Sequence, residues 1–265
     1  MESKNKLWLG LGVVCIAGVT MTSCGNEDAS DMADMGHDAM TASEGGEGGE
    51  GASSADSVAS DAVYLGQLAF IRGHLNVGVN LYREGDEEAS ATHMKHPESE
   101  IYAALQPALE ARGAPGFADQ LAALAVAVEN GQPLAEVETA YEALLQGITA
   151  AEQAVPDQHA RLLGNVIVDL LSTAAAEYDI AVGDDLALEN AHEYQDALGF
   201  IRIAYDLLAR VETMTDDAST VSAIREQLDL VRPAWTGLQP PQRLHTEPSV
   251  IYGAASRVEL AVSRL

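Results

Sequence analysis

The sequence is poor in basic residues, in cysteine and in alternating runs of β-branched residues. Among 265 residues there are 14 lysines and arginines against 41 acidic residues, a formal net charge of −27. Nucleic-acid binding requires a basic face for the phosphates, so this balance argues against a nucleic-acid partner. An acidic field is compatible with small cations, although it also simply favours solubility.

Cysteine occurs only twice, at Cys15 and Cys24. Cys15 lies in an N-terminal apolar run that we expect to be removed on export, which leaves Cys24 without a partner for an internal disulfide. The stability of the mature chain must therefore come from a hydrophobic core. A chain of 265 residues is long enough to build one.

The N-terminus has the residue order of a bacterial secretory signal. Two lysines precede an apolar run over 7–19, which is too short for a comfortable membrane span. The ending Met-Thr-Ser-Cys at 21–24 resembles a lipoprotein cleavage box, which implies a signal peptide over 1–23 and lipidation of Cys24. Gly25 after the cysteine favours the outer membrane, and an unlipidated cut nearby is the alternative. We therefore expect a lipid-anchored, periplasm-facing protein of the bacterial cell envelope.

The segment 24–58 is rich in Gly, Ser, Ala, Asp and Glu, a composition that predicts a disordered acidic linker. Within it, thioether and imidazole side chains recur at short spacing, at Met32, Met35, His37 and Met40. These soft ligands suit copper, chiefly Cu(I), so the linker is a candidate copper-binding tether. The alternative is that methionine recurs only because the segment has a low-complexity composition.

From position 59 to 265 the chain has the periodicity of one all-helical domain. Segments rich in Ala, Leu, Glu and Gln carry apolar residues three and four positions apart, and glycine and proline separate them. The short connections favour antiparallel neighbours, so we predict an all-α antiparallel helical bundle. The expected helices cover 59–84, 98–112, 115–130, 134–154, 158–182, 187–213, 217–231 and 248–263.

A weak internal echo suggests two related half-bundles, 59–155 and 156–265. Tyr64 is followed by Leu-Ala-Phe-Ile-Arg at 68–72, and Tyr194 is followed at the same spacing by Leu-Gly-Phe-Ile-Arg. The shared Phe-Ile-Arg run is more than helical periodicity requires, which favours duplication. Chance similarity between two amphipathic helices is the alternative.

Three of the seven histidines, His74, His93 and His96, lie close together in the sequence. His74 shares a helix face with apolar residues and should point inward. Pro97 is a favourable first helical residue, which would make His96 the N-cap and place Glu100 in the first turn. Core hydrogen bonding and capping explain these residues in part, but capping does not require two histidines. Imidazoles with a carboxylate suit iron, copper, zinc or nickel, so we predict a transition-metal site.

A second polar group lies near the start of the helix expected at 187–213. Glu189, His192, Glu193 and Asp196 share one face at helical spacing, and a solvated helix start is the alternative explanation. Only one Glu-x-x-His pair occurs, which argues against a ferritin-like di-iron site. The predicted metal ligands are His74, His93, His96, Glu100, Glu193 and Asp196.

A family resemblance rests on Ala-Glu-Tyr-Asp-Ile-Ala-Val-Gly at 176–183, Glu-Tyr-Gln-Asp at 193–196, and Phe200. These residues resemble a pattern in the periplasmic helical domains attached to high-affinity bacterial iron permeases. The exported all-helical organisation is also similar to imelysin-like iron-uptake proteins. Their Gly-x-His-x-x-Glu signature is not met, because Gly73 directly precedes His74 and a valine stands where the glutamate is needed. The resemblance implies a part in metal uptake without assigning any ligand.

No nucleophile elbow, phosphate loop, dinucleotide fingerprint or HExxH motif occurs, so we do not expect an enzyme. The favoured hypothesis is a membrane-tethered protein that binds a transition metal for an iron permease or another envelope metal transporter. Iron is the first choice of metal and copper the second. Two alternatives remain open at this point: copper sequestration through the methionine-rich tether, and a structural lipoprotein that docks an envelope protein without metal.

Deleting residues 31–40 separates the tether from the helical domain as a metal ligand. Copper bound per chain should fall, because the deletion removes three thioethers and one imidazole, whereas iron bound per chain should not change. Elemental analysis after dialysis against each metal measures both. Equal copper in the two proteins would rule out a tether site.

Overall fold

The computed structural model describes residues 53–265, apart from the side chains at positions 99 and 100. Within this range the chain is helical, and β-structure is limited to the isolated bridges Val182–Leu188 and Ala187–Arg243. The all-α fold class predicted from the sequence is confirmed. The predicted signal peptide, the lipidation site Cys24 and the tether ligands Met32, Met35, His37 and Met40 all lie outside the described residues.

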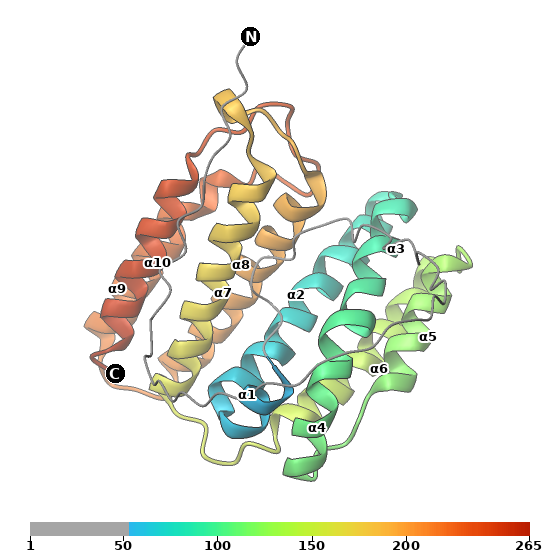
Figure 1. Ribbon diagram of the computed structural model, residues 1–265, viewed down its shortest axis with the longest axis horizontal. Coiled ribbons are helices and arrows are strands. Elements are labelled where there is room, and N and C mark those ends of the chain that lie inside the picture. The colour runs from blue at the N-terminus through green and yellow to red at the C-terminus, as the bar shows by residue number, and fades with distance from the viewer. Residues whose placement is uncertain (1–52) are drawn as a thin grey trace, which may run out of the picture. The chain divides into compact units, whose positions relative to one another are not determined.

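Figure 1 shows the order of the helices. They are α1 (Ser54–Ala59), α2 (Asp61–Glu84), α3 (Glu87–His96), the π-helical turn η1 (Pro97–Tyr102), α4 (Ala103–Arg112), α5 (Ala118–Glu129), α6 (Leu134–Glu152), α7 (Ala160–Ala181), α8 (Ala191–Glu212), α9 (Ala218–Val231) and α10 (Pro248–Val262). Short 3₁₀ turns, η2 (Asp184–Leu186) and η3 (Arg232–Ala234), lie in the connections. None of the helices within 53–265 is both long and apolar enough to cross a bilayer.

The last four helices form a bundle of their own. α7 contacts α8 and α10, while α9 contacts α8 and α10, so each helix has two neighbours around a shared core. Inward apolar side chains such as Leu170, Ile224 and Val258 are fully buried there. This bundle lies within 156–265, and the division of the domain into two related halves stays a prediction.

Helix α2 joins the two parts of the domain. It contacts α3 and α6 on one side and α7 and α8 on the other, and Figure 1 shows it between these groups. The two helices that carry the echoed sequence, α2 and α8, therefore pack on each other. Phe70 meets Phe200 edge to face with ring centroids 5.1 Å apart. Duplication itself stays a prediction.

Two glycines allow α2 and α8 to approach closely. A Cβ atom at Gly199 would lie 2.5 Å from the carbonyl oxygen of Gly73, and one at Gly73 would lie 2.5 Å from Phe200 Cδ1. Neither position has room for a methyl group. The glycines thus bring the backbones of the two helices into contact beside His74.

Another glycine of α2, Gly78, lets α3 pack closely against it. A Cβ at Gly78 would lie 2.6 Å from Met94 Cε and 3.2 Å from His93 Cβ. Met94 is buried in this contact. Gly78 stands one turn after His74, so α3 is held against the same stretch of α2 that contacts α8.

The structure corrects several predicted helix boundaries. Pro97 opens the π-turn η1 rather than a new helix after a break, and His96 has helical backbone angles and no capping hydrogen bond, because the chain stays helical from α3 through η1 into α4. A proline inside a helix removes one backbone donor and crowds the carbonyl four residues earlier, and the wider π-turn accommodates it. Ser60 interrupts the first predicted helix and caps α2 through Val63 N. The first helix, α1, begins at Ser54, inside the end of the predicted linker.

The helix at 187–213 begins later than predicted. Asn190 is the N-cap of α8, and its side chain accepts hydrogen bonds from the backbone N–H groups of His192 and Glu193. Glu189 lies before the cap, where its backbone N–H donates to Ala181 O. It therefore does not share a helix face with His192.

Gly199→Ala tests the helix contact. The added methyl group meets backbone at Gly73, so we expect the free energy of unfolding to fall by about 1–3 kcal/mol. Gly66→Ala on α2 is the matched control, since the nearest atom to its added Cβ would be Asp169 Oδ2 at 3.9 Å. There the higher helix propensity of alanine should raise the free energy of unfolding by about 0.5–1 kcal/mol. Urea unfolding measures both values. A Gly199→Ala protein as stable as wild type would mean that the contact is looser than described.

Candidate metal centre

A buried carboxylate, Asp196 on α8, is the centre of a cluster of histidines. His74 from α2 places Nδ1 2.6 Å from Asp196 Oδ1, and His93 from α3 places Nδ1 2.9 Å from the same oxygen. Both imidazoles are fully buried, and Asp196 is 1% exposed. Three helices, of which α8 is distant in sequence from α2 and α3, thus contribute to one polar contact.

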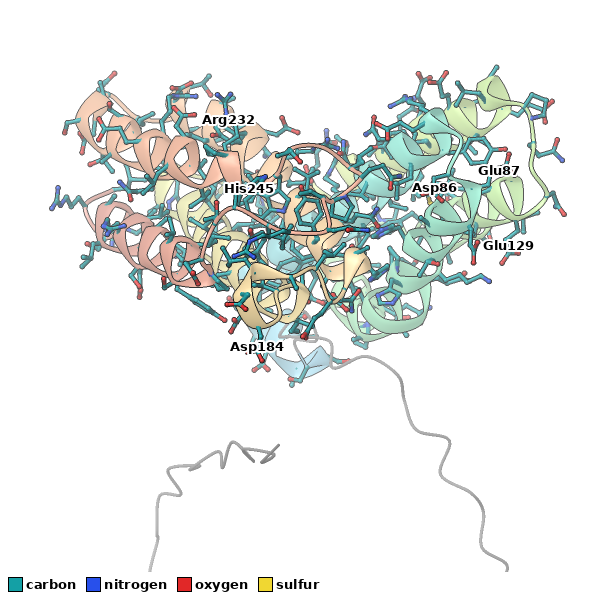
Figure 2. All side chains as sticks on the ribbon, turned by 90° about the horizontal axis from the view of Figure 1, so that it is seen from above. Asp86, Glu87, Glu129, Asp184, Arg232 and His245 are labelled. Atoms are coloured by element: carbon teal, nitrogen blue, oxygen red, sulfur yellow. The ribbon has the colours of Figure 1, made fainter. Side chains whose placement is uncertain are left out.

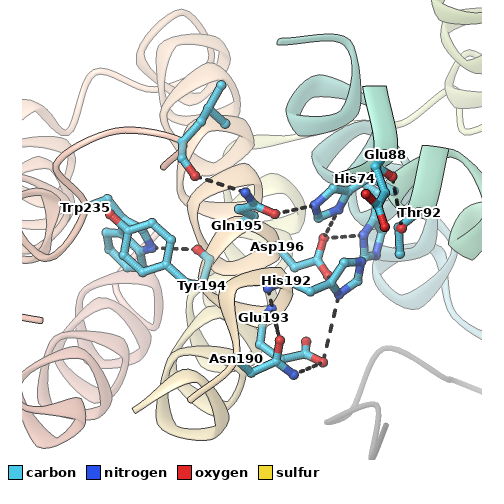
Figure 3. A network of polar contacts seen from close by, with 12 residues as sticks. His74, Glu88, Thr92, Asn190, His192, Glu193, Tyr194, Gln195, Asp196 and Trp235 are labelled. Atoms are coloured by element: carbon cyan, nitrogen blue, oxygen red, sulfur yellow. Dashed lines mark hydrogen bonds and ion pairs between the residues drawn. The ribbon is translucent and has the colours of Figure 1, made fainter. Parts of the chain in front are cut away.

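His192 reaches the other oxygen of the same carboxylate. It stands four residues before Asp196 on α8, and its Nδ1 lies 3.1 Å from Oδ2. Its ring stacks on that of His93, with centroids 4.3 Å apart and an interplanar angle of 10°. The ring centroid of His96 lies 4.8 Å from that of His192 and 5.7 Å from that of His74. Figure 3 shows Asp196 between His74 and His192.

These side chains form two groups that could each hold a metal ion. The inner group is His74, His93 and Asp196, all buried, and the outer group is His96, His192 and Asp196, in which both histidines are half-buried. In each group one ligand atom from every residue lies within 4.8 Å of the others. Each group offers two imidazoles and one carboxylate, the donor combination of many non-haem Fe(II) sites.

The protein holds Asp196 in its charged form. Burial would raise the pKa of this carboxyl, but the neighbouring His74 and His93 outweigh burial and hold the pKa well below its usual range. A carboxylate that stays ionised at neutral pH is available to a cation. The same charge requires compensation whenever no cation is present.

Gln195 fixes the hydrogen bonding of His93. Its Nε2 donates to the carbonyl of Leu238 at 3.0 Å, which leaves Oε1 facing His93 Nε2, also at 3.0 Å. Both ring nitrogens of His93 therefore face acceptors, namely Asp196 and Gln195.

A loop after α9 covers the N-terminal part of α8. Trp235 Nε1 donates to Tyr194 O at 3.0 Å, and the backbone N–H of Thr236 donates to the Tyr194 hydroxyl. Farther along, Gln239 Nε2 donates to Asp86 Oδ2 at 3.0 Å, at the start of α3. The loop therefore ties the C-terminal bundle to α3 across the cluster, as Figure 3 shows in part.

Most of the predicted ligands meet at this centre. His74, His93, His96 and Asp196 are together, although the sequence presented them as two separate candidates. Glu193 is buried at its edge, with Oε1 3.9 Å from His192 Nδ1 and accepting from Asn190 Nδ2, so its role as a ligand stays a prediction. The side chain of Glu100 lies outside the described part of the structure.

Sequence reasoning placed His192 in the second polar group but left it out of the predicted ligands, and it missed Gln195 altogether. The signal for His192 was available, because an imidazole four residues before Asp196 on a helix shares its face. Gln195 had no such signal. Its role depends on the loop carbonyl of Leu238, 43 residues away.

Residues 155–265 match the family model of the iron permease-associated 4-helix bundle domain. The matched region is the bundle α7–α10, which supplies His192 and Asp196. The other three histidines of the centre precede it. No curated protein and no solved structure gives a significant match to the chain. The resemblance to imelysin-like proteins stays a prediction.

Asp196→Asn tests the electrostatic account in metal-free protein. Removing one partner of a buried charge network should cost about 3–5 kcal/mol of unfolding free energy at pH 7. An aspartate with a lowered pKa stabilises the fold above its unfolded-state pKa of about 3.9, and this contribution is lost as the pH falls through the folded-state value. The difference from wild type should therefore shrink below about pH 4.

Chemical denaturation from pH 7 to pH 3, with a chelator present, measures this difference. Glu138→Gln is the matched control, because Glu138 pairs with Arg83 at the surface and the pair should contribute less than about 1 kcal/mol. A pH-independent loss in the Asp196 variant would contradict the charge argument.

Proposed function

We propose that this protein binds a transition metal at the His–Asp centre and takes part in its uptake. Iron is the favoured metal and copper the second. The protein acts by binding rather than by catalysis, and it is a lipid-anchored, periplasm-facing protein of the bacterial envelope. Its partner is an iron permease or another envelope metal transporter.

The observation that carries this proposal is the convergence of four imidazoles on one buried carboxylate. His74, His93 and His192 all contact this aspartate, whose two oxygens can accept about four hydrogen bonds. The ring of His96 completes the cluster. Apolar residues would fill the same space without the cost of burying polar groups. The presence of four imidazoles therefore indicates a function beyond packing.

Two further observations favour iron. Each of the two groups has the two imidazoles and one carboxylate of many Fe(II) sites. The C-terminal bundle matches a domain described as iron permease-associated. Copper binds more tightly than iron to most nitrogen ligands, so relative affinity in a test tube does not identify the physiological metal. Iron binding must therefore be measured directly.

Replacing histidines of the centre tests the proposal. The metal-free full chain is dialysed anaerobically against limiting Fe(II), and bound iron is measured by elemental analysis. We expect His74→Ala, and the double variant His93→Ala/His96→Ala, to lower Fe(II) affinity by more than about 100-fold, because each removes ligands themselves rather than their supports.

The matched control is His245→Ala. This histidine is exposed. In Figure 2 it lies well away from Asp86, the residue that marks the side of the cluster. Circular dichroism establishes that each variant is folded. Wild-type protein that binds no Fe(II), Cu(II) or Zn(II) would refute metal uptake and favour a structural envelope protein. Unchanged affinity in the folded histidine variants would place the metal elsewhere.

A further inference from the structure

The two oxygens of Asp196 face different sets of histidines. Oδ1 lies 2.6 Å from His74 Nδ1 and 2.9 Å from His93 Nδ1, which belong to the inner group. Oδ2 lies 3.1 Å from Nδ1 of His192, which belongs to the outer group. A carboxylate arranged in this way can bridge two cations, one at each oxygen.

We propose that the centre binds two divalent first-row metal cations, one in the inner group and one in the outer group, bridged by Asp196. This inference rests on the proposed function and specifies its stoichiometry. Bridged metal pairs in proteins are about 3.5–4 Å apart. The stacked rings of His93 and His192, one from each group, have centroids 4.3 Å apart, so the two groups are near neighbours.

One buried atom of the outer group has no partner in the described structure. His192 Nε2 is buried and has no hydrogen-bond partner among the described residues. Buried polar atoms are nearly always satisfied, but a cation at Asp196 Oδ2 would lie on the Nδ1 side of this ring, so Nε2 would take a separate ligand. In the inner group three polar side chains, His74, His93 and Asp196, are all buried together.

A pocket leads from solvent to the outer group. It has a volume of about 370 Å³, and its lining includes His192 and Gln195 of the centre and the acidic residues Asp86 and Glu88. Figure 2 shows Asp86 on the surface beside Glu87, and Figure 3 shows Glu88 near the cluster. Carboxylates at the mouth raise the local concentration of cations. The outer position therefore exchanges with solvent, whereas the inner position is enclosed.

Charge determines how the two ions bind. Two dications a few ångströms apart repel each other, and the bridging carboxylate offsets only part of this repulsion. The buried carboxylate of Glu193, 3.9 Å from His192 Nδ1, adds a second negative charge on the outer side. Binding should therefore occur in two steps, with the second ion bound more weakly than the first.

The experiment counts ions in the full chain. The tether ligands Met32, Met35, His37 and Met40 are replaced by alanine so that only the helical domain contributes. Metal-free protein is titrated anaerobically with Fe(II) alone to saturation, and iron per chain is measured. We expect two ions in this protein and in His245→Ala. We expect one ion in His96→Ala or His192→Ala, which disrupt the outer group, and one in His74→Ala, which disrupts the inner group.

A second measurement reports the bridge. Loaded with Cu(II), the protein should give the half-field electron paramagnetic resonance transition of a spin-coupled pair. His192→Ala should lose this transition while it keeps one Cu(II) with the spectrum of an isolated ion. Folding of every variant is checked by circular dichroism, and His96→Ala, at a half-buried position, serves where a buried change unfolds the chain.

The outcomes separate the two proposals. One ion per wild-type chain, lost in Asp196→Asn, would overturn the two-ion centre and leave the proposed function intact. No ion in the wild type would overturn both. Two ions that persist in His74→Ala and in His192→Ala, or two ions without spin coupling, would overturn the bridged arrangement.

Discussion

The buried charge of Asp196 is the constraint on which this domain depends. A carboxylate 1% exposed inside a helical core is costly unless donors surround it. Its donors come from both parts of the domain: His192 from the same helix, His74 from α2 and His93 from α3. The same four side chains therefore stabilise the charge of Asp196 and hold the N-terminal helices against the C-terminal bundle.

Glycine sets the distances that make this solution possible. Gly73 and Gly199 let α2 and α8 touch through their backbones, and His74 follows the first of these while Asp196 stands three residues before the second. Gly78 then lets α3 approach α2 closely enough for His93 to reach the carboxylate. A methyl group at any of these positions would push the helices apart. Shifts of a fraction of an ångström are enough to weaken hydrogen bonds and metal coordination.

Helical periodicity predicted the fold class and the inward direction of His74, because both depend on local pattern. It could not predict that His74 meets Asp196, since 122 residues separate them and no local rule fixes which helices are neighbours. Pro97 was misread for a related reason: its usual place is at a helix start, but packing of α3 and α4 on α2 keeps the helix continuous through a π-turn. The contact of Gln195 with the covering loop had no sequence signal at all.

The division of ligands between the two parts of the chain bears on how the centre relates to iron permeases. The bundle matched by the family model contributes His192, Glu193 and Asp196, which alone give one imidazole and two carboxylates. The three other histidines precede the match. The imidazole-rich donor set, a kind that suits transition metals better than Mg²⁺ or Ca²⁺, therefore forms only when α2 and α3 pack on the bundle. The family match concerns the bundle alone, whereas the candidate metal centre draws its side chains from both parts of the helical domain.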